Sequence, residues 1–126
     1  MIFKIIRKIR KVIFLVVFLG VLLLVGSFVY TVKLIKDGVS EQCAMAQESY
    51  EGDCTEAMLM KLSEEKLSTK DFNSLVWALG QLSDEKALDK LKELYESNTV
   101  SDKYELSKAI KLLEGGINIT KLIWKR

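Results

Sequence analysis

The longest apolar stretch of the chain lies between Lys11 and Lys33, where 21 consecutive residues carry no charge. Sixteen of these residues are Leu, Ile, Val or Phe. As an α-helix that rises about 1.5 Å per residue, residues 12–32 extend over about 31 Å, which matches the hydrocarbon thickness of a bilayer. Burial in a soluble core is the alternative, but the roughly 90 residues that follow are too few to surround this helix. We predict a transmembrane helix over residues 12–32.

Beyond residue 52 the apolar residues recur at helical spacing in four segments joined by short links. Each segment starts at a residue that can cap a helix, and two of these residues have an acidic residue three positions later, as in a capping box. The caps are Asp53 (with Glu56), Ser68 (with Asp71), Ser83 and Ser101. The predicted core positions are Met58, Leu59, Leu62, Phe72, Leu75, Val76, Leu79, Leu82, Ala87, Leu88, Leu91, Leu94, Tyr95, Leu106, Ala109, Ile110 and Leu113. No segment alternates like a strand, so the sequence predicts an all-α fold.

Two glycine sites are expected to interrupt the helices. Asp37-Gly38 breaks the helical pattern, so residues 33–52 are predicted as a juxtamembrane connector in which a short helix resumes near residues 40–49. Gly115-Gly116 is predicted to end the last helix. The expected organisation is a basic cytoplasmic segment (1–11), a transmembrane helix (12–32), a connector (33–52) and a helical domain (53–126).

The helix starts recur every 15 to 18 residues, so two helices form a unit of the size found in stacked helical hairpins. The run Leu75–Leu94 contains Ala78-Leu79-Gly80, a loop with Asp84, and the helical pattern Ala-x-x-x-Leu from Ala87 to Leu91. It resembles the short HEAT-like repeat of the phycobilisome-lyase type over residues 69–97, although the usual proline of the second helix is replaced by Asp89 or its neighbours. The resemblance implies a HEAT-like stack of hairpins that binds proteins. A four-helix bundle without solenoid geometry is the alternative.

The charges around the apolar stretch predict its orientation. Before it lie five basic residues that alternate with Ile and Phe, and after it only Lys33 and Lys36 follow within twenty residues. This imbalance predicts a cytoplasmic N-terminus and an extracytoplasmic C-terminal domain. A cleaved signal peptide is the alternative, but its apolar region is usually about 7 to 15 residues long, so we expect an uncleaved signal-anchor. The five basic residues are expected either to contact membrane lipid or to act as a topology signal alone: Lys4, Arg7, Lys8, Arg10 and Lys11.

Residues 37–126 carry 12 basic and 17 acidic residues, and this net negative charge argues against a nucleic-acid partner. Cys43 and Cys54 are the only cysteines, and the predicted orientation places both on an oxidising side. We expect a disulfide between them. Two buried free thiols and a redox or metal pair are the alternatives; the spacing is not Cys-x-x-Cys and the chain has no histidine, which argues against the latter.

We find no pattern for catalysis. The sequence has no histidine, no glycine-rich phosphate loop, no nucleophile elbow and no cluster of metal ligands. The acidic pairs Glu64-Glu65 and Asp84-Glu85 lie next to Lys66 and Lys86, which is typical of a solvated surface. We therefore expect no enzyme, no cofactor, no metal and no small-molecule substrate.

The tail from Ile117 to Arg126 is apolar with a basic end. It is expected to pack as a cap over the last helices; the alternative is a return to the membrane interface through Trp124, Lys125 and Arg126. Asn118 starts a glycosylation sequon, which matters only in a host that glycosylates this compartment.

The first functional hypothesis is a membrane-anchored adaptor or scaffold that binds proteins on the extracytoplasmic side. Its candidate partner surface is the outward face of the 84–96 helix, whose residues are otherwise solvated: Glu85, Lys86, Asp89, Lys92, Glu93 and Glu96. The second is a non-catalytic structural or accessory subunit of a larger membrane complex, held by residues 12–32. The third is a lipid-responsive role of residues 1–11.

Overall fold

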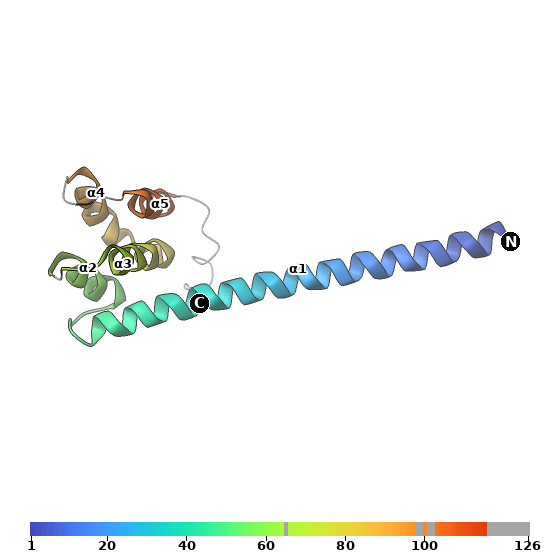
Figure 1. The fold of residues 1–126 in the computed structure, drawn as a ribbon, viewed down its shortest axis with the longest axis horizontal. Helices are drawn as coiled ribbons and strands as arrows, with labels where there is room; N and C mark the ends of the chain where they lie inside the picture. The colour runs from blue at the N-terminus through green and yellow to red at the C-terminus, as the bar shows by residue number, and fades with distance from the viewer. Residues whose placement is uncertain (65, 98–99, 101–102, 116–126) are drawn as a thin grey trace. The chain divides into compact units, whose positions relative to one another are not determined.

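The computed structural model describes residues 1–64, 66–97, 100 and 103–115. Within these ranges the chain is helical and has no strand, so the predicted all-α class is confirmed. The elements, labelled in Figure 1, are α1 (Ile2–Gln47), α2 (Cys54–Glu64), α3 (Thr69–Leu82), the 3-10 turn η1 (Glu85–Ala87), α4 (Leu88–Glu96) and α5 (Tyr104–Leu113). The chain divides into two compact units, Met1–Leu34 and Ile35–Arg126.

The first unit is the N-terminal part of α1, and nearly all of its side chains are exposed. Phe14 and Leu24, for example, are each 73% exposed. In the part of the chain that the structure describes, α1 is the one helix long and apolar enough to cross a membrane. Its length and composition are the basis of that statement, and a signal sequence shares both features.

The predicted helix break at Asp37-Gly38 is wrong, because α1 continues without interruption to Gln47. Gly38 lies against the indole of Trp77 in α3: a Cβ atom built on Gly38 would be 3.2 Å from Trp77 Cη2. Val39, Cys43 and Ala46 share one helix face and are buried in the second unit. Part of the segment predicted as a connector therefore belongs to the core.

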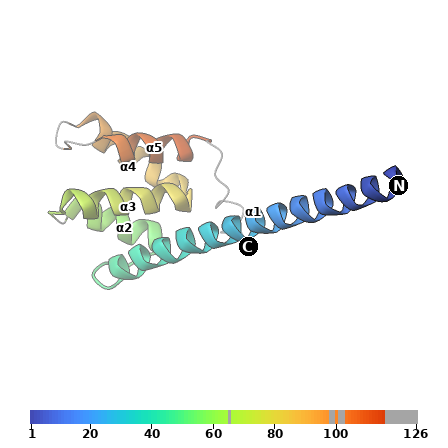
Figure 2. The ribbon, with the colours of Figure 1, turned by 45° about the vertical axis from the view of Figure 1, so that its right-hand side comes forward.

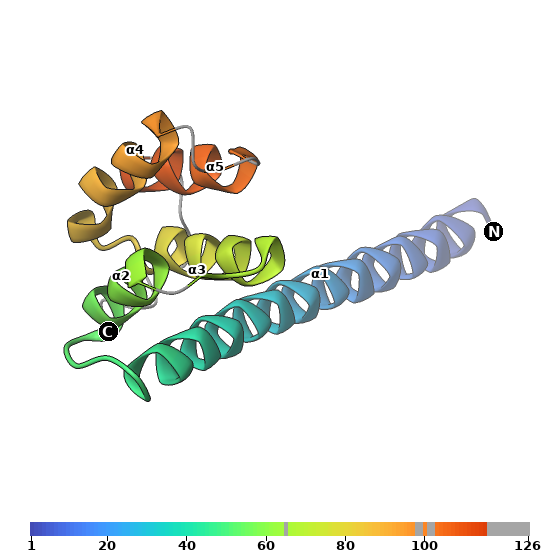
Figure 3. The same cartoon turned by 60° about the vertical axis from the view of Figure 1, so that its left-hand side comes forward.

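The second unit is built from short helices around an apolar core. In Figures 2 and 3, α2 lies beside α3 and α4 lies beside α5, and the closest packing between the pairs joins α3 to α5. The largest core side chains are Met58, Leu75, Leu79, Leu91 and Leu106, which the sequence pattern predicts. Five alanines are buried in the same core: Ala46, Ala57, Ala78, Ala87 and Ala109.

α3 and α5 run in the same direction. Asn73 and Trp77 line a hollow with Glu105 near the start of α5, whereas Gly80, near the end of α3, faces Ala109. A Cβ atom added to Gly80 would lie 3.0 Å from both Cα and Cβ of Ala109, so the absence of a side chain at Gly80 permits this approach. Between them in the chain lies α4, which runs antiparallel to α5: Lys92 in α4 pairs with Glu114 after the end of α5, and Tyr95, later in α4, lies under Lys103 before its start.

The predicted helix starts are confirmed for α2 and α3. The Glu56 N–H donates to Asp53 Oδ1 at 2.9 Å, and the Asp53 N–H donates to Glu56 Oε2 at 3.3 Å, which completes a capping box. At α3 the Asp71 N–H donates to Ser68 Oγ at 3.2 Å. These bonds satisfy backbone donors that the first turn of a helix leaves unpaired.

The third start is displaced from Ser83, which instead ends α3 in a left-handed conformation with φ of 53°. Asp84 caps η1, because its Oδ1 accepts from the Lys86 N–H at 3.1 Å, and α4 follows at Leu88. The fourth cap, Ser101, lies outside the described residues. α5 ends at Leu113, and Gly115 has φ of +117°, which confirms the predicted stop there.

Candidate functional site

Cys43 in α1 and Cys54 at the start of α2 form the predicted disulfide, with their Cα atoms 5.0 Å apart. Neither of the two cysteines of the chain is left as a free thiol. Closing a loop between residues separated by 11 positions removes unfolded-state entropy worth about 3 kcal/mol. The bond ties the last turns of α1 to α2 within the second unit.

Next to the disulfide, Lys86 links η1 to the capping box of α2. Its Nζ lies 2.9 Å from Asp53 Oδ2 and 3.6 Å from Glu56 Oε1. The N–H of Glu56 and then the ammonium of Lys86 lower the pKa of Asp53 below its ordinary value, and the Asp53 carboxylate raises the pKa of Lys86. Lys86 therefore forms an exposed ion pair between η1 and the start of α2, and its predicted contact with a partner stays a prediction.

The predicted partner surface on η1 and α4 is exposed at all six positions: Glu85, Lys86, Asp89, Lys92, Glu93 and Glu96. Besides Lys86, two of these residues form ion pairs inside the domain. Lys92 Nζ lies 2.8 Å from Glu114 Oε1, which raises the pKa of Lys92, and Glu93 pairs with Lys90 at 3.2 Å. The role of this surface in recognition stays a prediction.

Two of these six residues line a hollow of about 400 Å³ between α4 and α5. Lys92 and Glu96 come from α4, together with Tyr95, a residue that is 41% exposed. From α5 come Ser107, Ile110 and Lys111, followed by Glu114. Charges of both signs alternate around this hollow, so it has no clear preference for a charged ligand.

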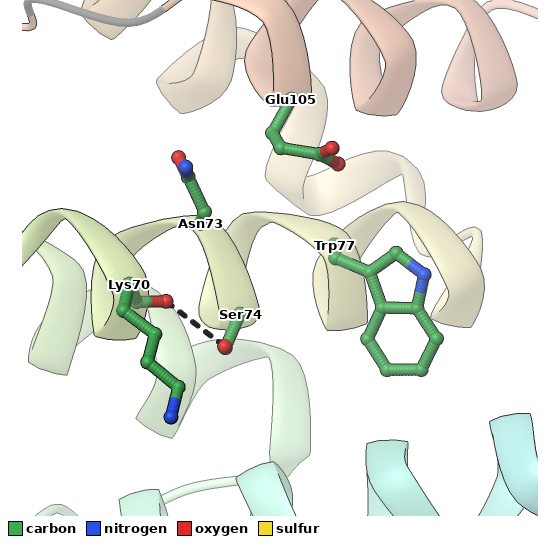
Figure 4. Close-up of a pocket in the computed structure, with 5 residues that line it drawn as sticks. All are labelled: Lys70, Asn73, Ser74, Trp77 and Glu105. Carbon is green, nitrogen blue, oxygen red and sulfur yellow. Dashed lines mark hydrogen bonds between the residues drawn. The ribbon is translucent and has the colours of Figure 1, made fainter.

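A second hollow, of about 350 Å³, crosses from α3 to α5, and we call it the α3–α5 groove. It is lined by Lys70, Asn73, Ser74, Trp77 and Glu105. The first four recur on α3 at positions i, i+3, i+4 and i+7, which lie on one helix face. Figure 4 shows that Glu105 extends from α5 toward α3 and that Asn73 points from α3 toward α5, whereas Lys70, Ser74 and the indole of Trp77 lie on the other side of α3. The sequence reasoning missed this groove.

The polar groups of the α3–α5 groove differ in how they are satisfied. Ser74 Oγ donates to the Lys70 carbonyl at 2.9 Å, and Glu105 Oε1 accepts from Lys108 Nζ at 3.2 Å. Asn73 Oδ1, in contrast, is buried and has no hydrogen-bond partner. A buried acceptor without a donor costs about 1–3 kcal/mol, so native structures rarely keep one without a reason.

The groove combines hydrogen-bonding groups with an aromatic ring. Asn73 Oδ1 and the Glu105 carboxylate are acceptors, the Lys70 ammonium is a donor, and the half-buried indole of Trp77 lines the same hollow. A peptide segment supplies both needs, because its backbone N–H donates and its side chains contact the ring. Among the described residues no cluster of His, Cys, Asp and Glu could hold a metal ion.

The predicted lipid-contact residues lie in the first turns of α1, and all five side chains are exposed: Lys4, Arg7, Lys8, Arg10 and Lys11. Their contact with lipid stays a prediction. The predicted cap over the last helices (117–126), its alternative at the membrane interface and the sequon at Asn118 lie outside the described residues. Comparisons with family models, characterised proteins and solved structures find no match to this chain.

Proposed function

We propose that the chain is a single-pass membrane protein with a cytoplasmic N-terminus and an extracytoplasmic helical domain. The excess of basic residues before residues 12–32 supports this orientation. The disulfide between Cys43 and Cys54 supports it independently, because disulfides persist in oxidising compartments and are rare in the cytosol. An impermeant thiol reagent tests it on intact cells: labelling should require prior treatment with an impermeant reductant.

The domain is proposed to be a short stack of HEAT-like hairpins. The parallel neighbours α3 and α5, separated by the return through α4, support this proposal, since stacked hairpins repeat such an order. The contact of Gly80 with Ala109 supports it as well, because Gly80 belongs to the Ala-Leu-Gly pattern on which the resemblance rests.

The function we propose is that of an adaptor that docks a protein segment in the α3–α5 groove. The observation that carries this proposal is the α3–α5 groove itself, a hollow of about 350 Å³ whose lining combines the unpartnered Asn73 Oδ1 with Trp77 and Glu105. Asn73 Oδ1 has almost no accessible surface in the free domain, so a docked peptide reaches it only after the side chains around it move; a peptide N–H bonded to this oxygen would then remove its desolvation cost. No catalytic step is assigned to the site. A membrane tether raises the local concentration of a partner in the same membrane, so weak binding is sufficient.

Site-specific photo-crosslinking in intact cells tests the docking proposal. The crosslinker replaces Ser74 in the groove or, as the control, Ser63 on α2. The two serines are matched, because each hydroxyl donates to the carbonyl four residues earlier at 2.9 Å. A discrete adduct from position 74 alone, lost in Trp77→Ala, is the expected result. Equal adducts from both positions, or none from position 74, would contradict the proposal.

The second candidate function is that of an accessory subunit held by its transmembrane helix. The exposed apolar side chains of residues 12–29 favour it, because other helices can cover them as well as lipid can. Replacing residues 12–32 with an unrelated transmembrane sequence separates the two functions. The adaptor keeps its adduct at position 74, and the accessory subunit loses both the adduct and its co-purifying complex.

A further inference from the structure

The basic residues at the start of α1 form a stripe because the helix begins at Ile2. Lys4, Arg7, Lys8 and Lys11 occupy positions i, i+3, i+4 and i+7, and at about 100° per residue they fall within an arc of about 100°. Arg10 lies outside this arc. Had the segment been irregular, the same five charges would have had no common face.

The opposite face of the same turns is apolar and uncovered. Ile2, Ile5, Ile6 and Ile9 lie there, and each of them is more than half exposed, with fractions of 71%, 54%, 53% and 52%. Because α1 continues without a break into residues 12–32, the basic and the apolar face of these turns lie on opposite sides of one helix that enters the bilayer.

The length of the helix places this segment at the depth of the head groups. Each head-group layer is about 5–8 Å thick, which corresponds to about the five residues of α1 that precede residue 12. With residues 12–32 in the hydrocarbon region, Arg7, Lys8 and Lys11 therefore lie at the depth of the phosphates, and the side chain of Lys4, about 12 Å from residue 12, has to extend back to reach them. Lysine and arginine side chains reach phosphates while their aliphatic stems stay on apolar surface.

We infer that Lys4, Arg7, Lys8 and Lys11 form a binding site for the phosphates of anionic phospholipids. This inference rests on the proposed membrane insertion of residues 12–32 and is separate from the proposed docking of a protein. Arginine binds a phosphate through two parallel hydrogen bonds, and the neighbouring lysines add point charges. Because the site depends on position, it distinguishes Arg7 from Arg10, whereas a topology signal depends on the number of charges alone.

The test uses the full chain reconstituted into phosphatidylcholine vesicles that contain a spin-labelled lipid. The association of spin-labelled phosphatidylglycerol is compared with that of spin-labelled phosphatidylcholine for the wild type, Arg7→Gln and Arg10→Gln. The two variants lose the same group and the same charge. We expect Arg7→Gln to lower the preference for phosphatidylglycerol about fivefold, from the energy of one basic residue near an anionic surface, while Arg10→Gln lowers it much less.

An equal loss of the preference for phosphatidylglycerol in the two variants, or no such preference in the wild type, would refute the proposed binding site. Flotation of the vesicles gives a separate readout of insertion. If the wild type does not float with the vesicles, the membrane anchor itself fails. If it floats but shows no preference for phosphatidylglycerol, the anchor stands and the lipid site is refuted.

Discussion

Asn73→Leu is expected to make the protein more stable and less able to dock a partner. Leucine has a similar size but no polar atoms, so it removes the buried Oδ1 that has no donor. The desolvation cost that disappears is about 1–3 kcal/mol, and the higher helix propensity of leucine adds a few tenths of a kcal/mol. The free energy of unfolding should therefore rise by about 1–3 kcal/mol.

Urea unfolding of the full chain in detergent micelles, followed by the helical circular dichroism signal, measures this change. The midpoint should rise by about 1–2 M at constant slope. Ser74→Leu is the control, because Ser74 lines the same groove but its hydroxyl already donates to the Lys70 carbonyl at 2.9 Å. That variant should gain only a few tenths of a kcal/mol from propensity. If Asn73→Leu gains no more than Ser74→Leu, the reasoning about the unpaired oxygen is refuted.

Three further predictions concern the packing of the domain. Replacing Cys43 and Cys54 with serine should lower the free energy of unfolding by about 3 kcal/mol, and reducing the wild type should reproduce that shift in the urea midpoint. Gly80→Ala should lower the free energy of unfolding by up to about 2 kcal/mol, because overpacking against Ala109 outweighs the gain in helix propensity. Adding Ala109→Gly to the same chain should recover part of this loss. If the effects of the two substitutions are strictly additive in a double-mutant cycle, the contact between Gly80 and Ala109 is contradicted. Because the pKa of Asp53 is lowered in the folded state, the Asp53 carboxylate stabilises the folded protein at pH values above its ordinary pKa of 3.8. This stabilisation is lost as the pH falls below 3.8. In that range the urea midpoint of the wild type should therefore fall more steeply than that of Asp53→Asn.

The helix cores were predictable from the sequence because their apolar positions follow a simple period. The end of α1 was not predictable in the same way. Glycine disfavours a helix interior by only about 1 kcal/mol, and the contact between Gly38 and the indole of Trp77 offsets that preference. A residue interpreted as a breaker is therefore a site of close approach. The start of the third helix was predicted at Ser83 because serine is common at helix caps. Asp84, one position later, is the residue that caps η1.

The α3–α5 groove could not be found from periodicity, because it combines α3 with Glu105, a residue some thirty positions further along the chain. One signal was present in the sequence. Trp77 lies outside the apolar stripe that contains Leu75, Val76 and Leu79, and a large aromatic residue on the polar side of a helix calls for a contact of its own. The partnerless state of Asn73 Oδ1, in contrast, is a property of the packed domain alone.

The small residues of the core limit how the sequence can diverge among homologues of this protein. These positions are buried, and a Cβ added to Gly80 would lie 3.0 Å from Cα of Ala109, so a larger side chain there overpacks the core, whereas leucine positions can exchange among several aliphatic residues. The intervals between the small positions should therefore persist after most other identities have changed. A search for distant relatives should therefore require small residues at the spacing of these positions: Ala46, Ala57, Ala78, Gly80, Ala87 and Ala109.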